Sequence, residues 1–404
     1  MNEILLFQFT GEDRPGLVAA ITARMARYNL DILDMGQAVI HDLLSLGILV
    51  HIPEQAESAP VVKDLLFLAH ELDLRLRCIP VSEEEYGRWA ALEDQKRYIV
   101  TLIGRTIGSV QVSELTQTLN EHGLNIEVIT RLSGRAPLVP NGESRPACVE
   151  FFVQGTPDDA LALRKEFLRI AQTRGVDIAL QEDNVFRRNR RLVAFDMDST
   201  LIQAEVIDEL AKEAGVGEKV AAITESAMRG EIDFQESFRR RLRLLKGLSA
   251  EALERVAARI PMTEGAERLI TNLKRFGYKI AIISGGFTWF GRKLQQRLGI
   301  DYLYANELEV KDGTVTGEVV GRIVDGARKA EVLREIAERE EISLQQVIAV
   351  GDGANDLPML NIAGLGIAFH AKPVVKEGAR QSISTLGLDS ILFLVGLRER
   401  DTTA

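Results

Sequence analysis

A short apolar run that ends in two aspartates constrains the fold of this chain more than any other feature. Arg191-Leu192-Val193-Ala194-Phe195 has the length of a strand, and Asp196-Met197-Asp198-Ser199-Thr200 follows it directly. In open α/β sheets, ligands bind at the carboxyl ends of the strands. Two carboxylates this close together repel each other, so they favour a bound cation or a shared proton. The alternative interpretation is a strand end that is followed by an Asp, Ser or Thr helix cap.

The composition is that of an ordinary globular protein and argues against several classes of partner. The 404 residues predict two or three domains, and 46% hydrophobic with 27% charged residues is typical of soluble domains. The formal net charge of -10 argues against nucleic acid or an anionic membrane as the main partner. Only Cys78 and Cys148 are present, so we expect no disulfide framework and a cytoplasmic location. We see neither a signal peptide nor an apolar run of about 18 residues, so we expect no membrane span.

The first 185 residues contain the same order of elements twice. The patterns read as strand, helix, strand, strand, helix, strand, which is the ferredoxin-like order. Residues 1–82 form the first predicted domain and residues 96–185 the second, with an acidic connector at Ser82-Glu83-Glu84-Glu85 between them. The segment from Ser133 to Pro146 is rich in proline and glycine, so we expect a long loop there.

The first loop of each copy carries a glycine where a helix begins. The first copy reads Asp13-Arg14-Pro15-Gly16-Leu17, and the second keeps the glycine as Gly108 without the Asp or the Pro. This half resembles a tandem pair of ACT domains, small modules that bind amino acids and regulate attached enzymes. The resemblance implies a homodimer that forms through the ACT domains and an amino-acid effector, such as serine, at Gly16, Asp31, Gly108 and Asn125. A missing Cβ lets a ligand approach a helix N-terminus. The alternative is that these residues only make turns and caps.

Residues 190–404 read as one α/β domain with a helical insertion. Strands alternate with helices in its later part, which indicates a mainly parallel sheet with helices on both faces. From about residue 204 to 261 the pattern is helical, so we expect a cap that is inserted after the first strand. Lys311-Asp312-Gly313-Thr314 predicts a type I′ hairpin. We interpret the basic segment from Phe186 to Arg191 as a solvated charge run rather than an attractor of anionic substrates.

Polar clusters follow three of the predicted strands. They are Asp196 with Asp198, Ser284 with Gly285, and Asp352 with Asn355 and Asp356, while Lys329 begins the helix that leads to the third. Because parallel strands end at one edge of a sheet, these side chains can converge. Several carboxylates together demand a cation, and oxygen ligands without His or Cys indicate a hard metal such as Mg²⁺. A carboxylate nucleophile, a carboxyl proton donor and phosphate-binding groups together predict hydrolysis of a phosphate ester.

These residues resemble the haloacid dehalogenase superfamily. The match comprises Asp-x-Asp-x-Thr at 196–200, the strand end at Ser284, Lys329, and Gly-Asp-Gly-x-Asn-Asp at 351–356. The resemblance implies that Asp196 is the nucleophile and Asp198 the general acid and base, and the second aspartate favours a phosphatase or phosphomutase. It also implies that Asp196, the main-chain carbonyl of Asp198 and Asp352 bind Mg²⁺, and that Asp356 supports this site without binding the metal directly. Ser284, Gly285 and Lys329 would bind the phosphate.

Within that superfamily, this half is similar to the phosphoserine phosphatase family. The resemblance implies that Glu205 binds the substrate ammonium and that Arg241 holds its carboxylate. Met228, Phe234 and Asn355 would complete the substrate site. Other interpretations remain for these residues: Glu205 as a first-turn helix charge, Arg241 as part of a solvated basic run, and Met228 and Phe234 as core residues.

We therefore expect a cytoplasmic, Mg²⁺-dependent phosphatase that converts O-phospho-L-serine into L-serine through an aspartyl phosphate, the last step of serine biosynthesis. An amino acid bound to the ACT domains would regulate it. One alternative is a phosphatase or phosphotransferase for another small phosphomonoester, and the other is an amino-acid sensor whose phosphatase half is inactive. The pair Glu205 and Arg241 favours an amino-acid substrate, and the intact acid, lysine and metal residues argue against the inactive sensor.

Overall fold

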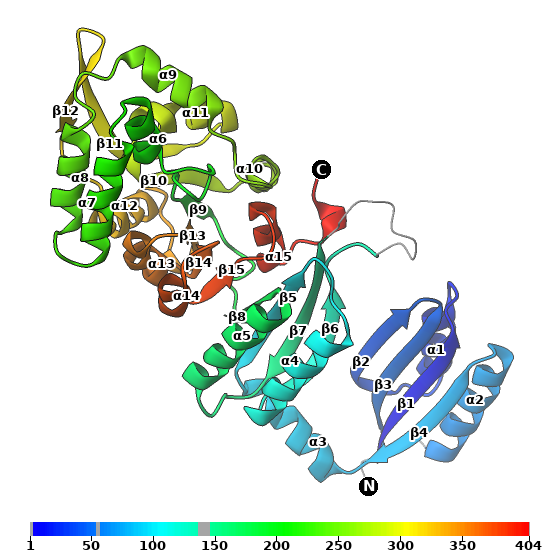
Figure 1. Cartoon of the computed structure of the whole chain (residues 1–404). Helices are drawn as coiled ribbons and strands as arrows, with labels where there is room; N and C mark the ends of the chain where they lie inside the picture. Colours follow the sequence, from blue (N-terminus) through cyan, green and yellow to red (C-terminus); the bar gives the residue numbers. More distant parts are fainter. Residues whose placement is uncertain (1–2, 54–56, 136–145, 404) are drawn as a thin grey trace. The chain divides into compact units, whose positions relative to one another are not determined.

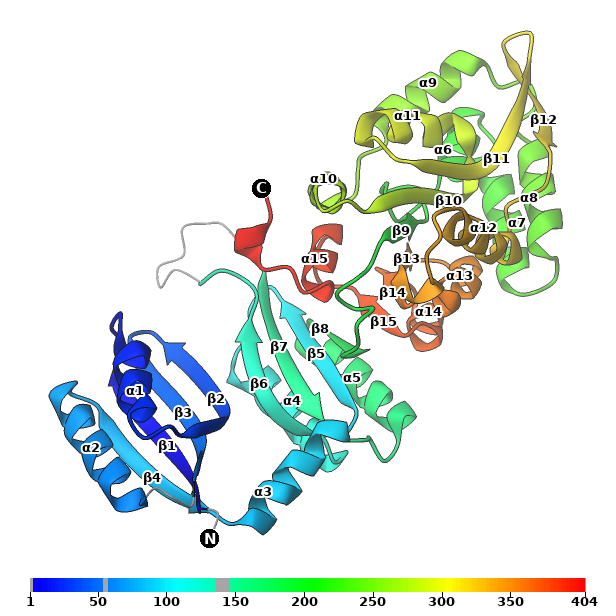
Figure 2. The same cartoon turned by 180° about the vertical axis from the view of Figure 1, so that it is seen from behind.

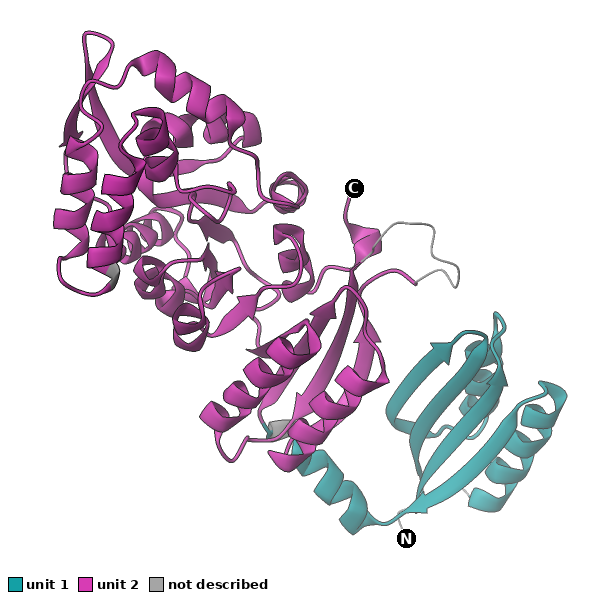
Figure 3. Cartoon of the chain, in the orientation of Figure 1, with its two compact units in different colours: residues 1–95 teal, residues 96–404 magenta. Residues whose placement is uncertain are grey.

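The structure, a computed structural model, describes residues 3–53, 57–135 and 146–403. The chain divides into two compact units, residues 1–95 and residues 96–404 (Figure 3). The first unit holds one ferredoxin-like fold, and the second holds another together with the α/β domain. The boundaries of the three predicted domains stay predictions, because the second ferredoxin-like fold and the α/β domain belong to one unit.

The first unit is an antiparallel sheet in the order β2-β3-β1-β4 with two helices packed on it. The elements are β1 (Glu3–Glu12), α1 (Leu17–Ala26), β2 (Asp31–Ile40), β3 (Leu43–Ile52), α2 (Ser58–Glu71) and β4 (Arg75–Val81). Burial alternates along β3, and the inward side chains pack on the apolar stripes of the two helices. The period-2 and helical patterns in the sequence thus predict this fold correctly.

The acidic connector is a helix, which the sequence interpretation did not predict. Helix α3 (Glu83–Ala90) begins with a capping box: the Glu85 N–H donates to the Ser82 hydroxyl, 3.2 Å away, and the Ser82 N–H donates to the Glu85 carboxylate, 2.9 Å away. A 3₁₀ turn, η1 (Ala91–Asp94), follows it. The spacing Ser-x-x-Glu is the sequence signal for such a helix start.

The second ferredoxin-like fold repeats the first. Its strands lie in the order β6-β7-β5-β8. The elements are β5 (Arg97–Gly104), α4 (Ser109–Glu121), β6 (Asn125–Arg131), β7 (Ala147–Gln154), α5 (Ala160–Arg174) and β8 (Val176–Glu182). The corresponding strands of the two copies also share a register shift, which lies between Ile32 and Asp34 in β2 and between Ile126 and Val128 in β6. The predicted internal repeat is therefore confirmed. Residues 136–145 of the predicted long loop lie outside the described residues.

A sheet in the order β12-β11-β10-β9-β13-β14-β15 forms the centre of the α/β domain, and its pairs are parallel except for that between β11 and β12. The strands are β9 (Leu192–Phe195), β10 (Lys279–Phe287), β11 (Tyr302–Lys311), β12 (Thr314–Val320), β13 (Val347–Gly351), β14 (Leu365–Phe369) and β15 (Gln381–Ile383). Along β9, alternate residues belong to two different buried clusters, so both faces of the sheet are covered. The mainly parallel sheet is therefore confirmed, while the short strand β15 was not predicted.

Helices cover both faces of this sheet (Figures 1 and 2). On one side lie α10 (Ala266–Arg275) and α11 (Thr288–Leu298), and on the other α12 (Gly326–Arg339), α13 (Leu357–Ile362) and α14 (Pro373–Gly378). Helix α15 (Ile391–Leu394) lies near the end of the chain. Asp312 and Gly313 have φ angles of 49° and 71°, which confirms the predicted type I′ turn between β11 and β12. Within the described residues, no helix is long and apolar enough to cross a membrane.

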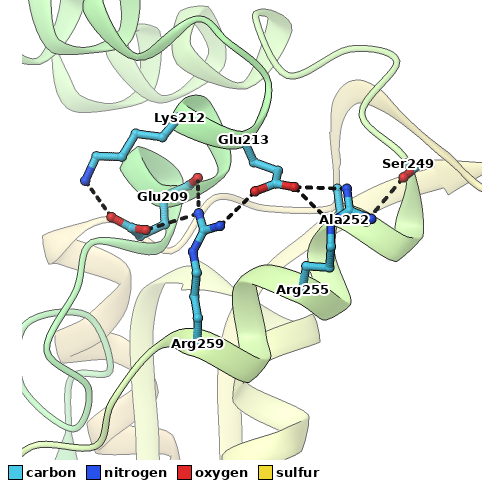
Figure 4. A network of polar contacts seen from close by, with 7 residues as sticks. All are labelled: Glu209, Lys212, Glu213, Ser249, Ala252, Arg255 and Arg259. Carbon is cyan, nitrogen blue, oxygen red and sulfur yellow. Dashed lines mark hydrogen bonds and ion pairs between the residues drawn. The ribbon is translucent and has the colours of Figure 1, made fainter.

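Four helices between β9 and α10 form the predicted cap: α6 (Val206–Glu213), α7 (Gly217–Met228), α8 (Phe234–Arg243) and α9 (Ala250–Arg259). Ion pairs join α6 to α9, because Glu213 contacts both Arg255 and Arg259, and Glu209 also contacts Arg259 (Figure 4). The start of α9 is attached to the β11–β12 hairpin, where the Ala250 N–H donates to the Gly313 carbonyl, 2.8 Å away. The cap is thus a cross-linked body that is attached to the edge of the sheet.

The basic segment before β9 is a solvated charge run only in part. Arg188 and Arg191 are exposed, as that interpretation predicts, but the other two arginines are buried. Arg187 and Arg190 are only 5% and 7% exposed. Arg187 forms a buried ion pair with Glu150 of β7, and Arg190 donates to the Gln345 carbonyl. Carbonyl and carboxylate partners compensate the buried guanidinium groups, which sequence alone does not reveal. The first of these contacts also ties the second ferredoxin-like sheet to the α/β domain.

Candidate active site

The three polar strand ends lie side by side because β9 is the neighbour of both β10 and β13. Asp196 and Asp198 follow β9, Ser284 and Gly285 lie near the end of β10, and Asp352 follows β13. The Asp196 N–H continues the pairing by donating to the Val350 carbonyl, 2.9 Å away. Strand order alone therefore brings together residues that are far apart in the sequence.

Lys329, on α12, is the fixed positive charge of the site. Its side chain is fully buried, with Nζ 3.0 Å from Asp196 Oδ1 and 2.6 Å from Asp356 Oδ1. Burial alone would lower the pKa of Lys329, but the carboxylates of Asp196 and Asp356 outweigh burial and raise that pKa above its ordinary value. The Met197 N–H also donates to Asp196 Oδ1, 2.8 Å away. The lysine therefore stays protonated and holds the Asp196 carboxylate in one orientation.

Asp198 is a buried carboxyl group with one unpartnered oxygen. Its Oδ2 accepts a hydrogen bond from the Val206 N–H at 3.4 Å, while its buried Oδ1 has no hydrogen-bond partner. A Cβ on Gly286 would lie within 3.0 to 3.1 Å of the two Asp198 oxygens, so glycine permits the close approach of β10. Burial, and then the carboxylates of Glu205 and Asp196, raise the pKa of Asp198 well above its ordinary range. A carboxyl group of this kind can hold a proton for a leaving group.

Asp196, Asp352 and Asp356 form an acidic group in which one oxygen from each lies within 4.8 Å of the others. When ionised, three carboxylates beside the single Lys329 ammonium leave two negative charges uncompensated. Burial and then the charge of Asp196 raise the pKa of Asp352 to about 8, and burial raises that of Asp356 to about 6. These shifts are those of a site that is short of positive charge. The residues therefore fit a metal ion, as hydrolases of this architecture generally use, and the charge deficit matches a divalent one.

The cap closes a cavity over these groups. The cavity is lined by Asp196, Asp198, Glu205, Ile207, Phe234, Phe238, Arg241, Ser284, Gly285, Gly286, Phe287 and Asn355. Glu205 accepts a hydrogen bond from the Ser199 hydroxyl, 2.8 Å away, and burial raises its pKa. Arg241 Nη1 lies 3.5 Å from Thr224 Oγ1, its buried Nε has no partner, and burial lowers its pKa. Arg241 is therefore not part of a solvated run, and it offers donors to the cavity.

The structure also gives positions to residues to which the sequence interpretation assigned no role. Asn306 is 1% exposed, donates to the Gly285 carbonyl at 2.7 Å and accepts from the Val324 N–H at 2.9 Å, so it fixes the end of β10. The Thr200 hydroxyl donates to Asp352 Oδ1 at 3.1 Å. Phe238 was detectable, because Phe234, Phe238 and Arg241 follow helical spacing on one face of α8. Nothing in the sequence marks Asn306.

The structure does not place two groups of predicted residues in the cavity. The side chain of Met228 lies outside the described part of the structure. Gly16 has a φ of 91°, where other residues are strained, so the turn alone accounts for it. Gly108 has a φ of -111°, which other residues also adopt, so backbone conformation alone does not require a glycine there. Asp31 and Asn125 are exposed at the starts of β2 and β6. Their binding of an effector stays a prediction.

Comparisons with known families agree with this geometry. The haloacid dehalogenase-like hydrolase family matches residues 193–361, from β9 into α13, and ACT domain families match residues 3–78 and 97–181. The fold and the site therefore define a hydrolase of the haloacid dehalogenase class that carries two ACT domains before its catalytic domain.

Individual relatives narrow this class. A phosphoserine phosphatase from Streptomyces coelicolor is 39% identical over 99% of this chain and 94% of its own length. Another, from Archaeoglobus fulgidus, is 53% identical over 61% of this chain and 72% of its own length. The crystal structure of a HAD family hydrolase from Salmonella enterica serovar Typhi gives a TM-score of 0.63 at 31% identity, over 74% of this chain and 98% of its own. The chain belongs to the phosphoserine phosphatase family.

Proposed function

We propose that this chain hydrolyses O-phospho-L-serine to L-serine and phosphate in the cytoplasm, as the last step of serine biosynthesis. The observation that carries the proposal is a single cavity in which Glu205 and Arg241 lie with Asp196 and Asp198. An ammonium can pair with Glu205, and a carboxylate can pair with Arg241. A phosphomonoester without these groups would leave both charges unpaired in a buried site, which is costly.

In the first step, Asp196 attacks the phosphorus, and the bond from phosphorus to the serine oxygen breaks. Lys329 and the Met197 N–H both bind Asp196 Oδ1, and these two contacts orient the carboxylate for the attack. Asp198 gives its proton to the departing serine oxygen. In the second step, Asp198 takes a proton from a water molecule that attacks the phosphorus of the aspartyl phosphate, which releases phosphate and restores both carboxyl groups.

Donors around the cavity hold the phosphoryl oxygens during both steps. The Ser284 hydroxyl accepts the Gly286 N–H at 3.0 Å, so its own proton is available for a phosphoryl oxygen. The Gly285 N–H, Asn355 and Lys329 are further donors in this proposal. The Asn306 side chain donates a hydrogen bond to the Gly285 carbonyl and so holds Gly285 in position.

We propose Mg²⁺ as the metal, held by Asp196, Asp352 and the main-chain carbonyl of Asp198. Asp356 is a poorer direct ligand, because Lys329 occupies its Oδ1 and the Gly353 N–H occupies its Oδ2 at 2.9 Å. When bound, Mg²⁺ neutralises charge on the phosphoryl oxygens.

Mg²⁺ should stabilise the folded protein more at pH 8 than at pH 6. At about 100 times its dissociation constant, it should raise the melting temperature by about 5 °C at pH 8. The effect should be smaller at pH 6, because the raised pKa of Asp352, about 8, means that the metal must displace a proton there. Differential scanning fluorimetry in chelated and Mg²⁺-loaded buffer measures this. A shift that does not depend on pH, or that persists in Asp352→Asn, contradicts the assignment.

A substrate panel tests the proposed function itself. With Mg²⁺ present, phosphoserine should be hydrolysed with the highest kcat/KM, ahead of phosphoethanolamine, which lacks the carboxylate, and of glycerol phosphate, which lacks both charged groups. Chelation of the metal should abolish all three activities. Equal kcat/KM values for the three compounds would show that Glu205 and Arg241 do not select the substrate.

Arg241→Ala should lower kcat/KM for phosphoserine by about 30- to 1,000-fold, because it removes one partner of a buried charge pair. The same variant should change kcat/KM for phosphoethanolamine by less than about 3-fold. Arg240→Ala is the matched control, since Arg240 is an exposed neighbour that pairs with Glu236 on the same helix. Equal losses on both substrates would remove Arg241 from the carboxylate site.

For the ACT domains, we propose that an amino acid such as serine binds near Gly16 and Asp31 and, in the second copy, near Gly108 and Asn125. We also propose a homodimer formed through these domains. The support is the match of both ACT families. Strand β2 adds to it, because this edge strand leaves Ile32, Met35 and Ile40 at least 45% exposed.

A further inference from the structure

The cap contacts the catalytic domain through a side-chain amide at the rim of the cavity. Gln235 Nε2, in the first turn of α8, lies 2.7 Å from Asp325 Oδ2 and donates to it. Gln235 directly follows Phe234, which lines the cavity. The contact therefore forms where the cap meets the substrate space.

Asp325 also begins the helix that carries Lys329. Its other oxygen, Oδ1, accepts the Arg328 N–H at 2.9 Å and so caps the N-terminus of α12. One turn later, Lys329 binds Asp196 and Asp356. A single carboxylate thus links the cap on one side to the helix of the buried lysine on the other.

We propose that Gln235 is a positioning residue, which holds the cap over Asp196 and Asp198 by binding Asp325. An amide can donate to the Asp325 carboxylate, whereas a carboxylate at residue 235 can only accept and would repel it. The kinetic consequence rests on the proposed function, but the conformational consequence does not.

Other polar contacts between the cap and the rest of the α/β domain lie elsewhere in the described structure. Lys293 of α11 pairs with Glu254 of α9, and the Ala250 N–H donates to the Gly313 carbonyl of the hairpin. Both involve α9, which the ion pairs with Glu209 and Glu213 cross-link to α6 (Figure 4). Just beyond the C-terminal end of α8, the Gly247 N–H donates to the Val315 carbonyl of β12, 2.8 Å away. Gln235 provides the corresponding attachment at the N-terminal end of α8, next to Phe234.

A charge exchange tests this role. In Gln235→Glu, two carboxylates face each other, and the double variant Gln235→Glu with Asp325→Asn restores a donor and an acceptor in reversed order. Asparagine also remains a good N-cap for α12. In Asp325→Asn alone, the one remaining side-chain oxygen caps α12, and the side-chain NH₂ can donate to Gln235 once the Gln235 amide turns over. Glu236→Gln is the control for loss of a neighbouring, partly exposed charge on α8.

The first measurement is hydrogen exchange of the backbone amides in residues 230–243 of the metal-loaded protein without substrate. Gln235→Glu should exchange faster there than wild type, and the double variant should return to within about 3-fold of the wild-type rate. The second is kcat/KM for phosphoserine, which should fall by about 10-fold in Gln235→Glu, mainly through KM, and recover in the double variant. Gln235→Leu should also lower kcat/KM for phosphoserine, but by less than Gln235→Glu. The melting temperatures of these variants should stay close to that of wild type.

Two results would overturn the role of Gln235: exchange rates in Gln235→Glu that equal those of wild type, or a double variant that is as perturbed as the single one. These outcomes can be distinguished from a failure of the proposed function. If phosphoserine is not a substrate but the exchange rates follow the predicted pattern, the proposed function fails and the contact stands. If phosphoserine is hydrolysed and exchange does not respond to the variants, the contact fails and the proposed function stands.

Discussion

Asp196→Asn is expected to reduce release of phosphate from phosphoserine by at least about 10⁴-fold. The amide is nearly isosteric, so it can occupy the same place beside Lys329, but it cannot attack phosphorus. Phosphate release by the purified variant and by wild type, at saturating Mg²⁺ and phosphoserine, measures the loss. Circular dichroism and the melting temperature show whether the fold is kept.

Asp198→Asn provides the comparison, because it keeps the nucleophile and removes the proton donor. On phosphoserine it should also be nearly inactive. With p-nitrophenyl phosphate, whose leaving group needs no proton, the variant should still form the aspartyl phosphate and then hydrolyse it slowly. Turnover of Asp196→Asn within about 10-fold of wild type would contradict the covalent mechanism.

Lys329→Met is expected to lower the free energy of unfolding by about 3–5 kcal/mol, because it leaves buried carboxylates without their cation. The lysine is fully buried and contacts both Asp196 and Asp356. Urea unfolding in chelated buffer measures the loss. Lys279→Met is the control. The Lys279 side chain is 47% exposed and its ammonium lies 3.7 Å from Asp301, so a loss of about 0.5 kcal/mol or less is expected.

The stability loss in Lys329→Met should depend on pH, and the direction of that dependence follows from the pKa of Asp356. Burial already raises the pKa of Asp356 to about 6, and loss of the lysine would raise it further. A carboxyl group with a raised pKa binds protons more tightly in the folded than in the unfolded state, so the stability of the folded state falls as pH rises through that window. The deficit of Lys329→Met should therefore shrink between pH 8 and pH 5. A loss as small as that of Lys279→Met, or a deficit that grows on acidification, would contradict the ion-pair account.

Periodicity and turn chemistry predict most of the fold, because most of its elements obey local rules. The repeated ferredoxin-like order, the hairpin at Asp312 and Gly313 and the position of the cap all follow from patterns a few residues long. The failures have physical causes. Strand β15 has three residues, too few to show a period, and Arg187 is buried only because Glu150, distant in sequence, compensates its charge. Helix α3 was missed although its capping box was present in the sequence.

The candidate site is predictable where its residues end neighbouring strands. Parallel strands place Asp196, Ser284 and Asp352 at one edge, so the motifs alone anticipate their meeting. Contacts that depend on how the cap packs are not encoded in this way. Asn306 acts through hydrogen bonds with Gly285 and Val324, and Gln235 acts through one with Asp325, and neither residue belongs to a recognisable pattern. Roles for the site residues therefore remain proposals that the variants above test.

Rapid quenching of the reaction with ³²P-labelled phosphoserine tests the central claim most directly. Before steady state, wild-type protein with Mg²⁺ should carry acid-stable label on the peptide that contains Asp196. Hydroxylamine, which cleaves acyl phosphates, should release that label, and Asp196→Asn should show none. Labelled phosphate that appears at full rate without any labelled protein, or label on a peptide without Asp196, would contradict the aspartyl-phosphate mechanism.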